Sequence, residues 1–167
     1  MSMQSRRFLI GTLLVTAWIL LSGSAHAAER KAAESKGIAV ESLPPAVQTT
    51  VREQTKGAVI HNISKEVEHG KTLYEVETKV GGRSRDMIIG ADGKLMVVEA
   101  QVVMDSLPAP ARETYMKHIG KGKIVALETV SLGDSLAYYE AQIEANGKRS
   151  ELKVDPNGNV VTDKKKK

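Results

Sequence analysis

Two segments of the sequence alternate charged or polar side chains with apolar or aromatic ones, and these segments contain the strongest candidates for binding chemistry. They are residues 74–80 (YEVETKV) and 138–144 (YYEAQIE). A period of two places every second side chain on the same face of a β-strand, so the charged residues would line a solvated sheet face. Such a face suits a protein or peptide partner, with an aromatic ring as an anchor. The predicted partner-binding residues are Glu75, Glu77, Lys79, Tyr138, Glu140 and Gln142.

Other interpretations of these charges remain open at this point. They could simply solvate an exposed sheet, and a peptide could instead add itself along an open strand edge. The acidic strand faces could also bind a small ligand or a divalent metal ion. Residues 155–159 (DPNGN) offer oxygen atoms, but the glycine is at the fourth position and no Glu follows at the twelfth. We therefore predict a turn there and not a calcium-binding loop.

Catalytic residue types are present, but not in the spacing that catalysis requires. The three histidines after the first 27 residues, His61, His69 and His118, have no second histidine four positions away, so they form no metalloprotease motif. No serine lies in a Gly-x-Ser-x-Gly turn, and the absence of cysteine excludes thiol catalysis, disulfides and cysteine zinc sites. We predict a non-enzymatic protein with no catalytic residues, no metal ligands and no cofactor.

The first 27 residues have the three parts of an export signal. Arg6 and Arg7 precede an apolar stretch at 8–21, and small residues follow up to Ala27. The apolar stretch of about 14 residues is shorter than the roughly 20 that a transmembrane helix needs. We predict cleavage after Ala27, a periplasmic or secreted protein, and no stable membrane anchor after cleavage.

The formal net charge of +4 comes from the two ends of the chain. Arg6, Arg7 and residues 164–167 account for six of the 24 basic residues, which leaves 18 basic residues against all 20 acidic ones at 28–163. Only four aromatic residues, all tyrosines, remain in that part. Duplex binding needs a basic surface and single-strand binding needs aromatic platforms, so we predict no nucleic-acid partner.

The sequence repeats itself at a shift of 64 to 65 residues. The matching pieces are Ser42-Leu43-Pro44 with Ser106-Leu107-Pro108, Lys56-Gly57 with Lys121-Gly122, Tyr74-Glu75 with Tyr139-Glu140, and Gly93 with Gly158. We predict a signal peptide (1–27), a linker (28–39), two repeats (40–103 and 104–163) and a basic tail (164–167).

Each repeat predicts one helix followed by a four-stranded antiparallel meander, which makes the chain an α+β protein. Ser42 and Ser106 are the expected helix N-caps, and Gly57 and Gly122 the expected helix ends. Because a repeat of about 60 residues buries little surface alone, the two sheets should share a core or align edge to edge. The apolar segment 95–103 is the expected central strand at their junction.

This succession of motifs resembles the PepSY-like, beta-lactamase-inhibitor-like family of exported proteins, over about residues 40–161. The resemblance implies an exported α+β binding module, whose relatives restrain peptidases or hold an enzyme on the concave face of a tandem sheet. This chain lacks the cysteines and the aromatic-rich surface of such an enzyme inhibitor, so beta-lactamase binding is not expected. The expected function is inhibition or modulation of a peptidase or another envelope protein, and the expected partner is an unidentified envelope or secreted protein or peptide.

Overall fold

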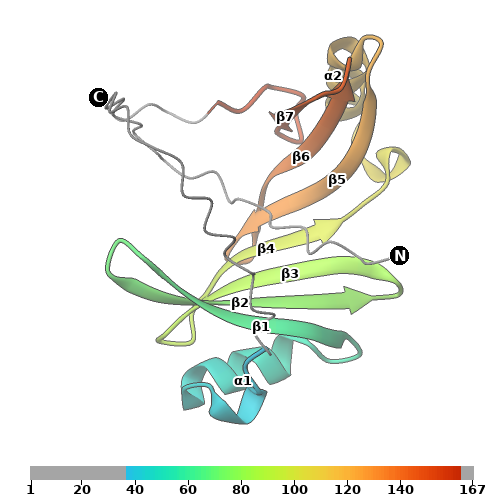
Figure 1. Cartoon of the computed structure of the whole chain (residues 1–167). Helices are drawn as coiled ribbons and strands as arrows, with labels where there is room; N and C mark the ends of the chain where they lie inside the picture. Colours follow the sequence, from blue (N-terminus) through green and yellow to red (C-terminus); the bar gives the residue numbers. More distant parts are fainter. Residues whose placement is uncertain (1–36, 163–167) are drawn as a thin grey trace, which may run out of the picture. The chain divides into compact units, whose positions relative to one another are not determined.

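The computed structural model describes residues 37–162 (Figure 1). The predicted signal peptide, most of the predicted linker and the basic tail lie outside the described residues. The described part is an α+β fold with two α-helices and one seven-stranded antiparallel sheet in the order β1 to β7. Its elements are α1 (Pro45–Gln54), β1 (Val59–Glu68), β2 (Lys71–Val80), β3 (Arg83–Gly90), β4 (Leu95–Gln101), α2 (Ala109–Ile119), β5 (Lys123–Leu132), β6 (Ser135–Ala145) and β7 (Lys148–Val154), with 3-10 turns η1 (Val40–Ser42) and η2 (Met104–Ser106) before the helices.

The sheet has seven strands where two four-stranded meanders were expected, so that part of the prediction was wrong. After β7, the chain turns and makes a single bridge between Val154 and Val160 in place of an eighth strand. The counterpart in the first half, β4, is paired on both sides, with β3 and with β5. Among the described residues, the segment after β7 has only β7 beside it, and a strand paired on one edge alone gains half of the ladder hydrogen bonds.

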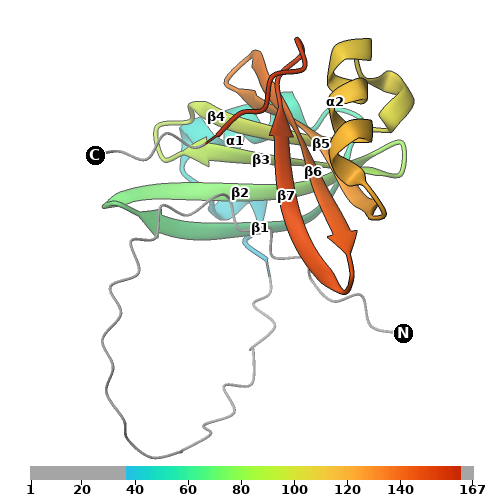
Figure 2. The same cartoon turned by 90° about the horizontal axis from the view of Figure 1, so that it is seen from above.

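The two halves of the sheet align edge to edge. Residues 97–101 of β4 pair with residues 128–132 of β5, so β4 is a central strand, as its apolar sequence predicts. Neighbouring strands in a sheet are rotated by about 20–25° relative to each other, and the rotation accumulates across the sheet. Seen from above, β7 therefore crosses the direction of β1 (Figure 2).

Both helices pack on the same face of the sheet. Val47 and Val51 of α1 are fully buried in a core with side chains of β1, β2 and β3. Ala111 and Tyr115 of α2 are fully buried in a second core with side chains of β5, β6 and β7. The strand register links the two cores, because Met87 lies opposite Val98, which lies opposite Ser131. Within residues 37–162, no helix is long and apolar enough to cross a membrane.

The helix boundaries differ from the sequence expectation by two or three residues. Pro44 and Pro108 are the N-caps, with extended backbone angles, and the serines lie in the preceding 3-10 turns. The leucine between each serine and proline decides this, since both leucines are 4% exposed and the chain turns to bury them. At the other end, α2 stops at Gly120, whose φ of +53° favours glycine, and not at Gly122.

Each helix is held to its sheet by a hairpin-like turn that follows a strand. Thr50 of α1 donates a hydrogen bond to the carbonyl of Gly93 (2.6 Å), and Thr114 of α2 donates one to the carbonyl of Gly158 (2.7 Å). A Cβ atom on Gly93 would lie 2.7 Å from the carbonyl oxygen of Ala46. The glycine is therefore required both for its positive φ of +83° and for the close approach of the helix.

Candidate functional site

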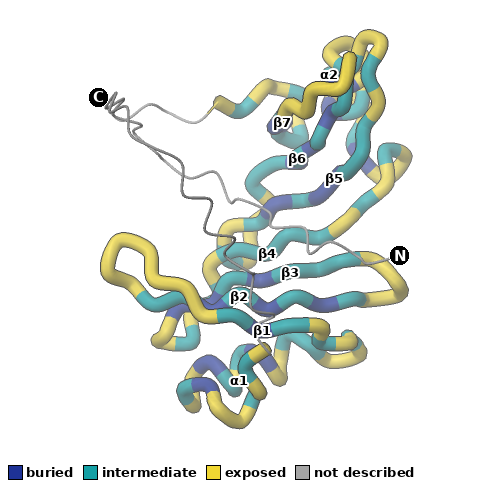
Figure 3. Tube along the Cα trace, in the orientation of Figure 1, coloured by how far each residue is buried: buried dark blue, intermediate teal, exposed yellow. Residues whose placement is uncertain are grey.

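The sheet face opposite the helices, which we call the open face, has no covering element among residues 37–162 (Figure 1). Along β2 and β6, buried positions that face the helices alternate with partly exposed positions on the open face (Figure 3). All six predicted partner-binding residues lie on this face. Three come from β2 and three from β6: Glu75, Glu77, Lys79, Tyr138, Glu140 and Gln142.

Carboxylates from five neighbouring strands form two rows across the open face. In the first row, Glu77 of β2 lies opposite Asp86 of β3, which lies opposite Glu99 of β4. In the second row, Glu128 of β5 lies opposite Glu140 of β6. Side chains directly opposite each other in antiparallel strands are about 5 Å apart at Cβ, and like charges in such pairs are destabilising. These five residues, which we call the carboxylate rows, therefore concentrate negative charge along the middle of the face.

Glu99 occupies the most perturbed position of the first row. Burial raises its pKa to about 7, and the charges of Glu128, Asp86, Glu75 and Glu151 act in the same direction. Glu99 is half-buried, because it lies in the middle of the sheet with carboxylates on both neighbouring strands. It is thus a carboxyl group that changes charge near neutral pH.

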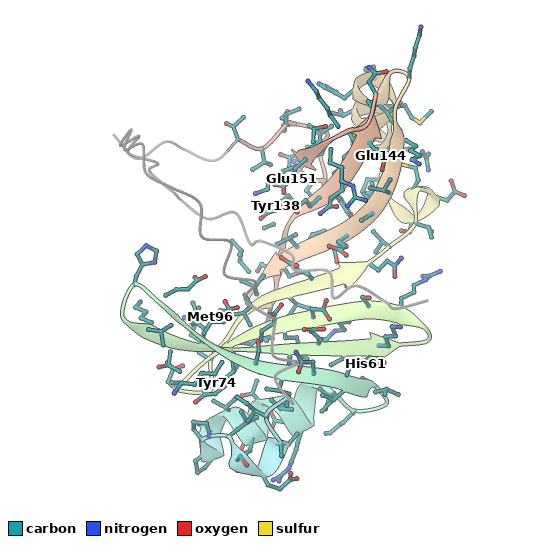
Figure 4. The ribbon with its side chains drawn as sticks, in the orientation of Figure 1. His61, Tyr74, Met96, Tyr138, Glu144 and Glu151 are labelled. Carbon is teal, nitrogen blue, oxygen red and sulfur yellow. The ribbon has the colours of Figure 1, made fainter. Side chains whose placement is uncertain are left out.

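The second row ends at a lysine. Lys153 of β7 lies opposite Glu140, with its Nζ 3.8 Å from Glu140 Oε2 and 3.2 Å from Glu151 Oε1. Burial raises the pKa of Glu140 to about 7, and the negative charge of Glu151 adds to this while Lys153 opposes it. The same Nζ lies 5.4 Å from the centre of the Tyr138 ring, a cation–π distance. Tyr138 and Glu151, both labelled in Figure 4, thus belong to one cluster around Lys153.

In the first half of the sheet, neutral side chains provide the hydrogen bonds to the carboxylates. Asn62 donates a hydrogen bond to Glu77 (3.0 Å), and Ser64 donates one to Glu75 (3.4 Å). Burial raises the pKa of Glu75, with further contributions from neighbouring acidic groups. Burial also raises the pKa of Asp86, although the backbone N–H of Thr78 stabilises its ionised form.

Apolar side chains separate the carboxylates on the same face. Ile88 of β3 lies opposite Val97 of β4, and Val130 of β5 lies between Glu99 and Tyr138 in the cross-strand register. Val130 is only 3% exposed although no helix covers it. The strands curve in this half of the sheet (Figure 1), and Tyr138 of β6 lies directly opposite Val130.

The segment 155–159 was the other candidate in the sequence for binding a cation. The carboxylate of Asp155 accepts hydrogen bonds from the backbone of Asn157 and Asn159 (2.9 Å each), so the segment 155–159 forms the predicted turn. Among residues 37–162, no group of three or more His, Asp or Glu side chains is arranged to hold a metal ion. A surface depression of about 300 Å³ lies beside Met96 and Leu132, and another of about 630 Å³ lies beside Met116 on α2.

Sequence reasoning missed three of the five residues of the carboxylate rows and the charged groups on β7. Glu99 could have been found from the sequence, because it is the one charged residue in the apolar segment 95–103. A single carboxylate in an otherwise apolar strand indicates a partly buried charge, which is uncommon. The missed residues are Asp86, Glu99, Glu128, Glu151 and Lys153.

Comparison with known proteins gives the fold. No family model matches the chain, and no curated protein matches it. A BLIP-like protein from Bacteroides fragilis matches with a TM-score of 0.55 and 16% identity, over 70% of this chain and 82% of that chain. A protein from Bacteroides eggerthii assigned to the periplasm matches with a TM-score of 0.61 and 13% identity, over 72% and 86%. A DUF2874 family protein from Bacteroides ovatus gives 0.59 and 14%, over 72% and 85%.

None of these neighbours is described as an enzyme. The PepSY part of the resemblance, the repeat boundaries and the identity of the partner stay predictions. The α+β part of the expected fold is confirmed, and residues 37–162 have the fold of BLIP-like proteins.

Proposed function

We propose that this chain is an exported, non-enzymatic binding protein that holds an envelope or secreted protein on its open face and thereby inhibits or modulates it, with a peptidase as one class of target. The observation that carries the proposal is the open face itself. It extends over seven strands, has no covering element among residues 37–162, and carries hydrogen-bonding, charged and apolar side chains from both halves of the sheet. A solvated sheet face without a role would not need half-buried carboxylates in its centre.

Two further observations support the proposal. The sequence begins with the features of an export signal, and one structural neighbour is assigned to the periplasm. The fold is shared with a BLIP-like protein, although at 16% identity. We therefore propose a periplasmic location and protein binding, and we do not extend the proposal to beta-lactamase as the target.

The proposal can be tested by site-specific photo-crosslinking in the envelope fraction. A photo-reactive phenylalanine analogue replaces Gln142, which lies on the open face, and in a second protein it replaces Met116, which is 62% exposed on α2. We expect a discrete crosslinked protein from position 142 and not from position 116. The same crosslinks from both positions, or none from position 142, would contradict binding at the open face.

A further inference from the structure

We infer that the open face binds a polypeptide segment that presents lysine or arginine side chains between apolar ones, and that this association strengthens as the pH rises from 6 to 8. The inference rests on the proposed function and adds the chemistry of the partner. The charged side chains of the open face are mostly acidic.

Acidic groups dominate the centre of the open face. The carboxylate rows and the flanking Glu75 and Glu151 place seven carboxylates on six adjacent strands. The basic side chains beside them are Lys153 and, at the margin of β2, Lys79. Glu144, further along β6, is already paired with Lys123 (3.3 Å) and Arg149 (3.7 Å).

The carboxylates of the first half form no close ion pair within the described residues. No lysine, arginine or histidine at 37–162 forms an ion pair with Glu75, Glu77, Asp86 or Glu99. Burial of a charge is costly unless the charge is paired, and like charges opposite each other in a sheet add to that cost. A cation from outside this part of the chain would remove both costs, so the face is complementary to a basic partner.

The apolar positions on the same face distinguish a polypeptide from a simple cation. Ile88 and Val97 are partly exposed beside the carboxylates and offer apolar surface that a metal ion or a small amine does not use. A polypeptide with alternating basic and apolar side chains contacts both the carboxylates and the apolar surface. The stem of lysine or arginine packs on apolar surface while its charged head reaches a carboxylate.

The charged surroundings of the two most perturbed carboxyl groups give the pH dependence. Four carboxylates add to the rise in the pKa of Glu99 by their charge: Glu128 on β5, Asp86 on β3, Glu75 on β2 and Glu151 on β7. The other charged groups on the open face around it are Glu77 on β2, Glu140 on β6 and Lys153 on β7. His61 on β1 lowers the pKa of Asp86 by its charge. With pKa values of about 7, Glu99 and Glu140 are mostly protonated at pH 6 and mostly ionised at pH 8. If the partner binds only the ionised form, each group contributes up to about a tenfold gain in affinity over this range.

The test uses the full chain and a ten-residue peptide of alternating lysine and valine, with the corresponding glutamate–valine peptide as a control. Binding is measured by titration calorimetry at pH 6 and pH 8 with wild type, with the triple variant Glu75→Gln/Glu99→Gln/Glu140→Gln, and with a matched triple variant. The matched variant carries Glu41→Gln, Glu53→Gln and Glu113→Gln, three exposed carboxylates off the open face. Glutamine keeps the size of the side chain, Glu75 and Glu99 form no ion pair among the described residues, and Lys153 keeps its ion pair with Glu151 when Glu140 is changed, so the open-face variant should fold.

We expect the lysine peptide to bind wild type more tightly at pH 8 than at pH 6 by at least fivefold. The open-face variant should bind at least tenfold more weakly at pH 8 and lose the pH dependence, whereas the matched variant should change less than twofold. Equal loss in both variants, equal binding of the glutamate peptide, or an affinity independent of pH would overturn the inference. A protein crosslinked at position 142 that still binds the open-face variant at both pH values would overturn it and leave the proposed function intact. Failure to crosslink any protein, with the lysine-peptide results as expected, would overturn the proposed function alone.

Discussion

The unpaired charge of Glu99 should make the protein less stable as the pH rises, and Glu99→Gln should remove that loss. Its pKa of about 7 in the folded protein compares with an ordinary value of 4.5. The folded state therefore binds more protons than the unfolded state between these values. The stability linked to this carboxyl group is fully present below about pH 4.5 and is lost as the pH rises through about 7.

The size of the effect follows from the shift. A pKa difference of one corresponds to about 1.4 kcal/mol, so the rise from 4.5 to about 7 sets an upper limit of about 3 kcal/mol on the stability lost. Because water reaches this half-buried side chain, we expect a loss of about 1–2 kcal/mol. Glu99→Gln should raise the free energy of unfolding by that amount at pH 8 and leave it nearly unchanged at pH 4.5.

Urea denaturation followed by circular dichroism at pH 4.5, 6 and 8 measures these values. Glu113→Gln, which changes an exposed carboxylate on α2, is the control and should stay within about 0.5 kcal/mol of wild type at each pH. The reasoning is refuted if Glu99→Gln destabilises the protein at pH 8, or if its gain is as large at pH 4.5 as at pH 8.

Three further substitutions, the first with a matched control, test separate parts of the structure by the same measurement. Gly93→Ala should cost about 2–4 kcal/mol, because its φ is +83° and its Cβ would lie 2.7 Å from the carbonyl of Ala46, whereas Gly70→Ala, with a φ of +75° and open space, should cost about 1 kcal/mol. Tyr115→Phe removes a buried hydroxyl that donates a 2.7 Å hydrogen bond to a carbonyl of β6, and should cost about 1 kcal/mol; no loss would contradict that bond. Lys153→Met should destabilise the protein by about 1–3 kcal/mol at pH 8 and by less at pH 5, where its partner on β6 is protonated; a loss independent of pH would argue against the ion pair.

The sequence was sufficient to locate the open face because the signal for it is local. Alternation within β2 and β6 separates the buried Tyr139 from Tyr138 and assigns Glu75 and Glu140 to the solvated side without knowledge of any other strand. The turn glycines, including Gly93, were readable for the same reason, since a positive φ is a property of one residue.

The carboxylate rows could not be predicted in this way, because they depend on register between strands. Asp86 and Glu99 become opposite neighbours only after β3 and β4 pair, and no pattern within either strand specifies which residues meet. The missing eighth strand has a similar origin. The turn 155–159 matches the turn after β3, but only the first half has a further strand, β5, to pair with the segment that follows.

The short ladder between β4 and β5 has a mechanical consequence. Each half of the sheet has its own helix and its own core, and within residues 37–162 the backbone hydrogen bonds that join β4 to β5 run along residues 96–102 and 127–133. A bend at this ladder would change the curvature of the open face without opening either core. Glu99 and Glu128 lie within the ladder itself, so protonation of Glu99, or a cation bound beside the two carboxylates, would reduce the repulsion at the junction of the two halves.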